Sequence, residues 1–519
     1  MSRRTRPAAA PSPAPIADYA PPAPAARQDD RLELVVAAAV SIVTAAVYFS
    51  GRLDFSNIDE YNGRRFAGDF VGSLRDYIML ADLGSGRFRP MYWVLQGALT
   101  AITGSSATVV MLGRLAFLAA GTWFQYRLSR RLGASRPIAA LLTCALAWSL
   151  PAIAIWTPGG PAEAFGTPLS VACAYLVLVA SSPRGVVAAG AVGLLAALTK
   201  ESYAAWTAAA LGALAISEFL RGRRGPVAWL AGGAAVLQLV PPIIATQGPK
   251  PLNGTYLEYV VHAISGTPAQ VWQMLETQLA LAIVVGALGL AAIAVRLVRT
   301  GVRAWPLEDL LVLAVLGAAL AEVFGLGLTM PRYLVPVGSG LLLVAARGSI
   351  ALGHRRPLAL AMTAALAVCV LLGGLRAGMA ARMAAGDRRV DGRLRAQIAG
   401  ALRTHGAVRI YWYPSMVEQP VGALTHLKLD GLANGEVQLL PCVRPHPSEA
   451  AHLANIFAPY AAPVSKPAPI IVSTLCPKVG QGPLAETGCA IGLPNLMSPG
   501  LPSYGCAEKH EHAKLFPPQ

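Results

Sequence analysis

The sequence contains little charge. Only 13% of its 519 residues are Asp, Glu, Lys or Arg, whereas a soluble domain carries about 25%. Acids are especially few, 27 against 43 basic residues, which leaves a formal net charge of +16. The low charge content excludes an ordinary soluble protein, and the basic excess can reflect membrane topology instead of a nucleic-acid partner.

Cysteine is also scarce, and the seven cysteines show no CxxC or CxxxxH spacing, so no metal site is predicted from them. Cys144, Cys173 and Cys369 lie within apolar runs and are interpreted as small hydrophobic residues. The other four form an even set in the polar carboxyl-terminal part, which suits up to two disulfides outside the cytoplasm. They are Cys442, Cys476, Cys489 and Cys506. No internal repeat is evident, which argues against an inverted-repeat transporter.

Apolar residues make up 55% of the chain and gather in runs of about twenty residues, the length that crosses a bilayer core. We therefore predict an all-α polytopic membrane protein with about eleven transmembrane helices, within residues 31–376. The expected spans are 32–50, 106–128, 136–156, 163–181, 184–200, 202–220, 226–246, 279–298, 307–328, 331–347 and 356–376.

Two segments near the amino terminus are expected not to cross the membrane. Residues 1–30 combine Pro, Ala and a few arginines, which predicts a disordered cytoplasmic tail. Between these two segments, the run Leu32 to Ser50 is expected to cross the membrane: it lacks a convincing cleavage site and is interpreted as a retained anchor. Residues 91–103 are too short to span, so we expect a helix on the membrane surface between Pro90 and Gly104.

The placement of arginine sets the orientation. With this set of spans, nineteen of the 43 basic residues fall in the amino-terminal tail and the loops on its side of the membrane. Short connections on the other side carry only Lys200, Lys250 and Arg332. By the positive-inside rule the amino terminus is cytoplasmic and the carboxyl terminus is outside. The expected location is a bacterial-type inner (plasma) membrane.

Three segments face outward in this topology: the loops 51–105 and 247–278, and residues 377–519. The last segment begins with a basic helical stretch, Arg382 to Arg403, and continues with β-like runs at 408–413, 436–440 and 469–473. It predicts a small extracytoplasmic α/β domain.

The first outward loop carries the candidate catalytic acids. Asp59 and Glu60 are adjacent carboxylates about nine residues beyond the first span, where a general base could act on a substrate at the interface. The alternative is a solvated, charged loop. Two adjacent carboxylates supply too few ligands to predict a metal, so no cofactor is assigned, although a divalent cation stays open.

Basic residues at outward helix ends are candidate anion ligands. Arg87 and Arg89 flank Phe88 and could hold a phosphate, or they could anchor the next helix to lipid headgroups. Lys200 and Glu201 lie between two spans, where charge is costly unless paired or functional. Arg332 has no flanking acid and needs Glu322, Glu201 or a substrate phosphate as its partner.

The second outward loop, 247–278, is aromatic-rich and partly amphipathic, which suits a lid at the membrane surface. His262 lies within it, either as an interfacial histidine or as a substrate contact.

Together these motifs resemble the GT-C superfamily of polyprenyl-phosphate-sugar-dependent glycosyltransferases, especially its protein O-mannosyltransferase and lipid A aminoarabinose transferase branch. Four short motifs carry the resemblance: Asp59-Glu60, Arg87-Phe-Arg-Pro-Met-Tyr-Trp93, Leu198-Thr-Lys-Glu201 and Pro331-Arg-Tyr-Leu-Val-Pro336. The likeness covers residues 32 to 376 in organisation and does not extend at residue level to the part after 377.

The resemblance implies roles for individual residues. Asp59 becomes the catalytic base, with Glu60 as its neighbour or an acceptor contact, and Lys200 and Arg332 bind the lipid-linked phosphate. Tyr333 shares the Arg332 motif and joins the substrate-binding set. Some mannosyltransferases have a His shortly after the acidic pair, where this chain has Arg64 and Arg65, so the branch and the acceptor are left open.

The leading hypothesis is an integral membrane glycosyltransferase, expected to invert the anomeric carbon. It transfers a sugar from a polyprenyl-phosphate donor to a lipid, glycan or protein acceptor on the outer face. Membrane lipids are its surroundings and nucleic acid is not a partner. The first rival is a transporter or flippase of lipid-linked glycans, which would favour charges inside the spans, such as Arg114 and Glu322. The second rival is a non-catalytic protein whose outer domain binds a cell-envelope partner.

Overall fold

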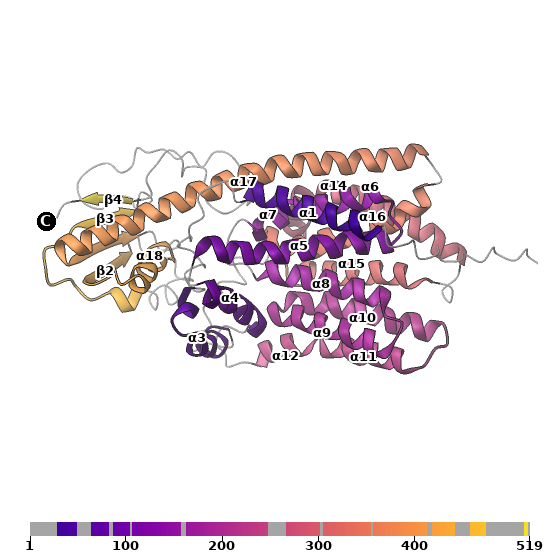
Figure 1. The fold of residues 1–519 in the computed structure, drawn as a ribbon, viewed down its shortest axis with the longest axis horizontal. Coiled ribbons are helices and arrows are strands. Elements are labelled where there is room, and N and C mark those ends of the chain that lie inside the picture. Colours follow the sequence, from indigo (N-terminus) through magenta and orange to yellow (C-terminus); the bar gives the residue numbers. More distant parts are fainter. Residues whose placement is uncertain are drawn as a thin grey trace, which may run out of the picture.

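The computed structural model describes residues 29–48, 64–82, 87–103, 106–156, 162–247, 266–300, 305–353, 356–412, 418–441, 457–473 and 513–516. Asp59, Glu60, His262 and the four carboxyl-terminal cysteines lie outside these ranges. The molecule is elongated, with a helix bundle at one end and a small sheet domain at the other (Figure 1).

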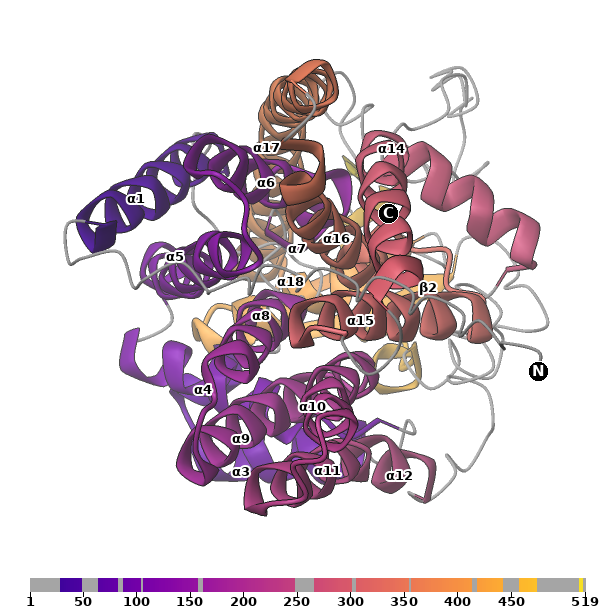
Figure 2. The same ribbon diagram turned by 90° about the vertical axis from the view of Figure 1, so that its right-hand side faces the viewer.

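A helix occupies each of the eleven predicted membrane ranges. The bundle contains α1 (Asp29–Tyr48), α5 (Ala107–Arg131), α6 (Arg136–Ala147), α7 (Leu150–Trp156), α8 (Glu163–Val179), α9 (Pro183–Thr199), α10 (Ser202–Leu220), α11 (Pro226–Leu237), α12 (Val240–Gln247), α14 (Pro268–Thr300), α15 (Leu307–Gly325), α16 (Val335–Gly353) and α17 (Arg356–His405). Figure 2 shows them packed side by side when the bundle is viewed from its free end.

Fewer of these helices than the eleven expected are long and apolar enough to count as membrane spans. Among the described residues, six helices are long and apolar enough to cross a membrane, or seven if the bent pair α6–α7 counts as one. The bend of 59° falls next to Pro151, the second residue of α7, because proline cannot donate to the preceding turn. Helices α1, α8 and α9 are apolar but shorter, and α15 carries Glu308, Asp309 and Glu322. The polytopic all-α class is nevertheless confirmed.

Close helix packing in the bundle depends on small residues. A Cβ atom built on Gly289 of α14 would lie 2.5 Å from the carbonyl oxygen of Val344, and one on Gly348 of α16 would lie 2.4 Å from the Cα of Gly289. These two glycines therefore let α14 and α16 approach to backbone contact, as small residues do in membrane helix pairs.

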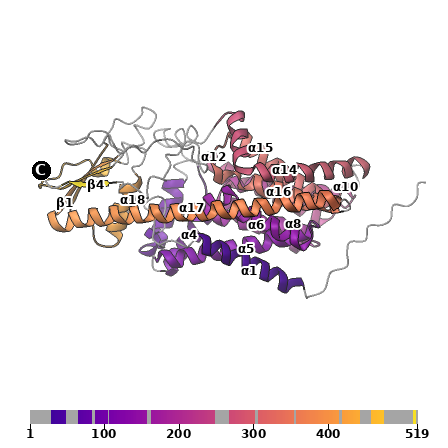
Figure 3. The ribbon, with the colours of Figure 1, turned by 90° about the horizontal axis from the view of Figure 1, so that it is seen from above.

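Two helices differ from their expected ranges. Helix α14 begins at Pro268 instead of 279, and its one non-helical residue, Leu279, marks a kink at the predicted start of the span. Helix α17 has 50 residues and continues without a break past 376, because its Ala- and Arg-rich sequence keeps helical propensity after its apolarity ends. Figures 1 and 3 show α17 running from the bundle to the sheet domain.

Short helices cover the end of the bundle that faces the sheet domain. They are η1 (Arg65–Ala67), α3 (Phe70–Asp76), η2 (Tyr77–Asp82) and α4 (Pro90–Thr103). The helix expected at 91–103 is thus present and begins at Pro90. Phe66, Tyr77, Tyr92 and Trp93 are buried together here, with the Tyr77 and Trp93 rings stacked at 4.3 Å between centroids.

The carboxyl-terminal part forms the expected α/β unit. Its described elements are β1 (Ala407–Trp412), α18 (Glu418–Leu429), β2 (Glu436–Pro441), η7 (Ala458–Tyr460), β3 (Ile470–Ser473) and β4 (Ala513–Phe516). The strand order is β2-β1-β3-β4, with β1 parallel to β2 and β3, and β4 antiparallel to β3. Three strands match the predicted runs within about a residue, and β4 was not predicted.

Candidate functional site

A charged cluster lies at the end of the bundle nearest the sheet domain. We call Glu163, Lys200 and Arg332 the sheet-side cluster. The Lys200 ammonium donates to Glu163 Oε1, and Arg332 Nε lies 3.7 Å from the same oxygen. Lys200 Nζ also lies 3.8 Å from the centre of the Tyr333 ring. One carboxylate therefore holds two cations side by side over an aromatic ring.

Local structure explains how distant residues meet here. Glu163 is the first residue of α8. Lys200 directly follows α9 in an extended conformation, with φ −164° and ψ 134°, and only Glu201 separates it from α10. Arg332 and Tyr333 lie in η5 (Pro331–Leu334), directly before α16. All four residues are thus at helix ends on one side of the bundle, as the expected topology required of Lys200 and Arg332.

Burial differs within the sheet-side cluster. The side chains of Glu163 and Lys200 are only 4% and 10% exposed, whereas that of Arg332 is 34% exposed. A cation that is partly accessible beside one that is buried suits recognition of an anion that arrives from outside, because the buried pair is already in place.

A second network connects α4 to this cluster. Asp82, 1% exposed, accepts from Arg89 Nη2 at 2.7 Å and from Trp93 Nε1 at 2.7 Å. Glu201, the neighbour of Lys200, accepts from the backbone N–H of Phe88. The segment that carries Arg87 and Arg89 is therefore tied to the turn that carries Lys200.

The electrostatics of Arg89 indicate an organising role. Burial alone would lower the pKa of Arg89, but the charges of Asp82 and Glu201 raise it above the usual range. Arg89 is consequently always charged and engaged with Asp82. Arg87 donates its backbone N–H to the Asp82 carbonyl at 2.8 Å, and its charge acts on Tyr333, so it belongs to the surroundings of the sheet-side cluster.

Sequence analysis missed two acids of this site, Glu163 and Asp82. It offered Glu322 or Glu201 as the protein partner of Arg332, whereas the structure pairs Arg332 with Glu163. The sequence did contain a signal for Glu163, because this residue begins a predicted span on the same outward side as Lys200 and Arg332. Within the described residues no group of three or more His, Cys, Asp or Glu side chains could hold a metal ion.

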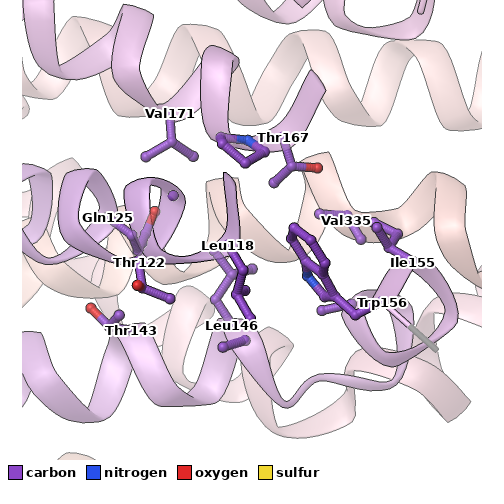
Figure 4. A pocket seen from close by; sticks show the side chains of 14 residues that line it. Leu118, Thr122, Gln125, Thr143, Leu146, Ile155, Trp156, Thr167, Val171 and Val335 are labelled. Carbon is purple, nitrogen blue, oxygen red and sulfur yellow. The ribbon is translucent and has the colours of Figure 1, made fainter. Parts of the chain in front are cut away.

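An apolar pocket lies next to the cluster in the bundle (Figure 4). Thr167 and Val335 line it, and each is within about one turn of a cluster element, Glu163 and η5 respectively. Gln125 points into the pocket with neither side-chain oxygen nor nitrogen hydrogen-bonded to any described residue. The other lining residues are Leu118, Gly121, Thr122, Thr143, Leu146, Ala147, Ala152, Ile155, Trp156, Pro168 and Val171.

The fold and the site together define a polytopic membrane protein with a charged cluster at one end of its bundle, and comparison with solved structures specifies the fold. The chain is similar to a structure described as ArnT from Cupriavidus metallidurans bound to undecaprenyl phosphate. The TM-score is 0.53 and the identity 13%, over 86% of this chain and 94% of that one. The apo structure of the same protein gives a TM-score of 0.51 at 13% identity, over 86% and 93% of the two chains.

This similarity shows that the chain has the same overall fold as the two ArnT structures. It shows the architecture of the chain and leaves the residue roles to be argued from the site. No protein-family sequence model matches the chain, and no curated protein sequence is significantly similar to it.

Proposed function

We propose that this protein is an integral membrane glycosyltransferase that transfers a sugar from a polyprenyl-phosphate donor to an acceptor on the outer face of the membrane. The observation that carries the proposal is the sheet-side cluster, where Lys200 and Arg332 converge on Glu163 beside an apolar pocket. The similarity in fold to a protein solved with undecaprenyl phosphate supports it.

In the proposed reaction the cluster binds the donor phosphate. Lys200 and Arg332 contact its oxygens, and Glu163 keeps the two cations together before the donor arrives, so little reorganisation is needed. Arg87 adds positive charge from the α4 side, and Tyr333 provides an aromatic surface below Lys200. The beginning of the prenyl chain enters the apolar pocket at Thr167 and Val335.

Chemistry requires a base and a leaving group. Asp59 takes the proton of an acceptor hydroxyl as its oxygen attacks the anomeric carbon, and Glu60 orients that hydroxyl. The bond from the anomeric carbon to the phosphate oxygen breaks, the electron pair leaves with the carrier phosphate, and a single displacement inverts the carbon. His262, in the second outward loop, is assigned a contact to the sugar. The amino terminus is cytoplasmic, and the sheet domain is outside.

Transfer from a radiolabelled polyprenyl-phosphate sugar by the purified protein in lipid nanodiscs tests the proposal. A panel of donors and of lipid, glycan and peptide acceptors is offered to the wild type and to Asp59→Asn, Glu60→Gln and Glu163→Gln. Asp76→Asn serves as the control, because Asp76 is an exposed acid of the same outer region. We expect Asp59→Asn to abolish transfer and Asp76→Asn to keep it.

A flippase is the rival that the same purified protein can exclude once it is reconstituted into vesicles. Arg114, which that rival would use, is buried against Gln96 at 3.4 Å, the Ile155 carbonyl at 3.5 Å and the Phe165 ring, which indicates a packing role. Movement of labelled donor across the vesicle membrane without chemical change, together with no sugar transfer to any acceptor by the wild type, would replace the glycosyltransferase proposal by the rival.

A further inference from the structure

The segment that follows Asp59 and Glu60 in the chain contacts the sheet domain. Arg64 Nη2 lies 2.5 Å from Asp430 Oδ1, and Arg64 Nη1 lies 2.9 Å from His426 Nδ1. His426 is in α18 and Asp430 directly follows that helix. A guanidinium group has only donors, so Nδ1 of His426 accepts and the imidazole is neutral. This contact joins residues more than 360 positions apart.

The contact is more than a surface ion pair. The Arg64 side chain is 13% exposed and His426 is 1% exposed, whereas Asp430 is 40% exposed. Helix α18 packs on α17, and its residues Leu424 and Leu427 belong to the core of the sheet domain. Arg64 is therefore held by a helix that is itself fixed in a hydrophobic core, which gives the contact a defined geometry.

Two residues further along, the same segment is fixed from the other side. Phe66 is 1% exposed and stacks on Tyr77 at 5.4 Å and on Trp93 at 6.3 Å between ring centroids. A Cβ atom on Gly97 of α4 would lie only 2.5 Å from the Phe66 ring, so the ring lies directly against the helix backbone. Trp93 then donates to Asp82, within the network that reaches Glu201 and Lys200.

We infer that Arg64 is a positioning residue, and that the sheet domain is part of the catalytic unit instead of a separate binding module. Arg64 and Phe66 hold one short stretch between α18 and α4, and Asp59 and Glu60 lie only five and four residues before Arg64. This inference rests on the proposed function. Loss of the Arg64 contact leaves the phosphate-binding residues in place but misplaces the base, so it lowers kcat and spares the KM for the donor.

A double-mutant cycle in the full-length protein tests the inference. Arg64→Ala and Asp430→Asn are each expected to lower kcat about fivefold or more, the lower end of typical coupling between sites, with the donor KM within about twofold. The double variant should be no worse than the worse single variant, because both changes remove one contact. His426→Asn, which keeps an acceptor, should retain activity that His426→Leu loses.

The control is Glu218→Gln, which removes the acid that pairs with Arg221 and Arg223 where α10 ends, away from the sheet-side cluster. It should leave kcat unchanged. Effects of Arg64→Ala and Asp430→Asn that equal this control, or that add fully in the double variant, would overturn the inference.

A second readout separates this inference from the proposed function. Amide hydrogen exchange should accelerate in peptides covering 64–82 and 90–103 for Asp430→Asn but not for Glu218→Gln. Faster exchange in a protein without transferase activity would refute the proposed glycosyltransferase function but support the positioning role of Arg64. Unchanged exchange in an active protein would refute the positioning role of Arg64 alone.

Discussion

Two clusters, each of one acid and two bases, lie near opposite ends of α16. In the sheet-side cluster Glu163 binds Lys200 and Arg332. In the second, which we call the far-side cluster, Asp309 binds Arg296 and Arg347. The exposures also match: the acids are 4% and 0% exposed, and the bases are 10% and 34% in one cluster and 11% and 30% in the other. Charge count and burial therefore do not distinguish a candidate site from a structural ion pair.

The surroundings make the difference. The far-side cluster is completed by the backbone: Arg347 Nη1 also donates to the Leu132 carbonyl at 3.4 Å, which ties α16 to the end of α5. The sheet-side cluster instead borders an aromatic ring, an apolar pocket and the network of Asp82 and Glu201. A candidate site is therefore distinguished from a structural ion pair by its connections to a pocket and to the short helices that cover the bundle end, and not by its charge.

Asp309→Asn should have the largest effect on stability. It leaves Arg296 and Arg347 without their carboxylate, and removing one member of a buried pair costs about 3 kcal/mol. Unfolding of the purified protein in a denaturant series measures this loss. Transfer per folded molecule should be unchanged, whereas the matched Glu163→Gln should lower both stability and transfer. Equal loss of transfer in the two variants would erase the distinction between the clusters.

Lys200→Met should have the next largest effect, in this case on turnover. The methionine keeps the apolar stem but removes the charge, and loss of one donor to a developing anion lowers kcat about 100-fold. Arg347→Met makes the equivalent change in the far-side cluster and should keep kcat within about twofold. Steady-state kinetics with labelled donor compare the two, and a similar fall for Arg347→Met would contradict a phosphate role specific to Lys200.

Gln125→Leu should have the smallest effect and the opposite sign. Gln125 is 1% exposed and its amide has no hydrogen bond to the described residues, so an apolar replacement of similar size should stabilise the protein by about 1 kcal/mol. Thr122→Val is the control in the same pocket. Thr122 donates to the Ala119 carbonyl at 2.9 Å, so its replacement should not stabilise. A lower melting temperature for Gln125→Leu would show that the amide is satisfied.

Local sequence patterns predicted most of the fold. The apolar runs located the bundle helices, the alternating runs near 408, 436 and 469 located three strands, and Pro90 marked the start of α4. The features that the sequence did not predict depend on contacts between distant parts of the chain or on the continuity of a helix. Strand β4 pairs Phe516 with Ile470, and a four-residue run so far along the chain has no local signal of its own. The boundary expected near 376 falls inside α17, since a change in hydropathy need not end a helix.

The site was predictable in part for the same reason. Topology alone placed Lys200 and Arg332 on one side of the membrane, where the structure brings both to Glu163. Their partner could not be read from the sequence, because Glu163 lies 37 and 169 positions away from them and only packing of α8, α9 and η5 selects it. Asp59, Glu60 and His262 lie outside the described residues, so their roles stay predictions.

The continuity of α17 has a mechanical consequence. A 50-residue helix is about 75 Å long at 1.5 Å per residue, and its final turns lead straight into β1, an inner strand of the sheet. Such a helix acts as a lever arm whose apolar part, Pro357–Arg382, lies along the edge of the bundle. A small change in the tilt of this part would produce a larger displacement at the carboxyl-terminal end of α17. Lipids or substrates that contact α17 in the bundle would then shift the sheet domain without contacting it.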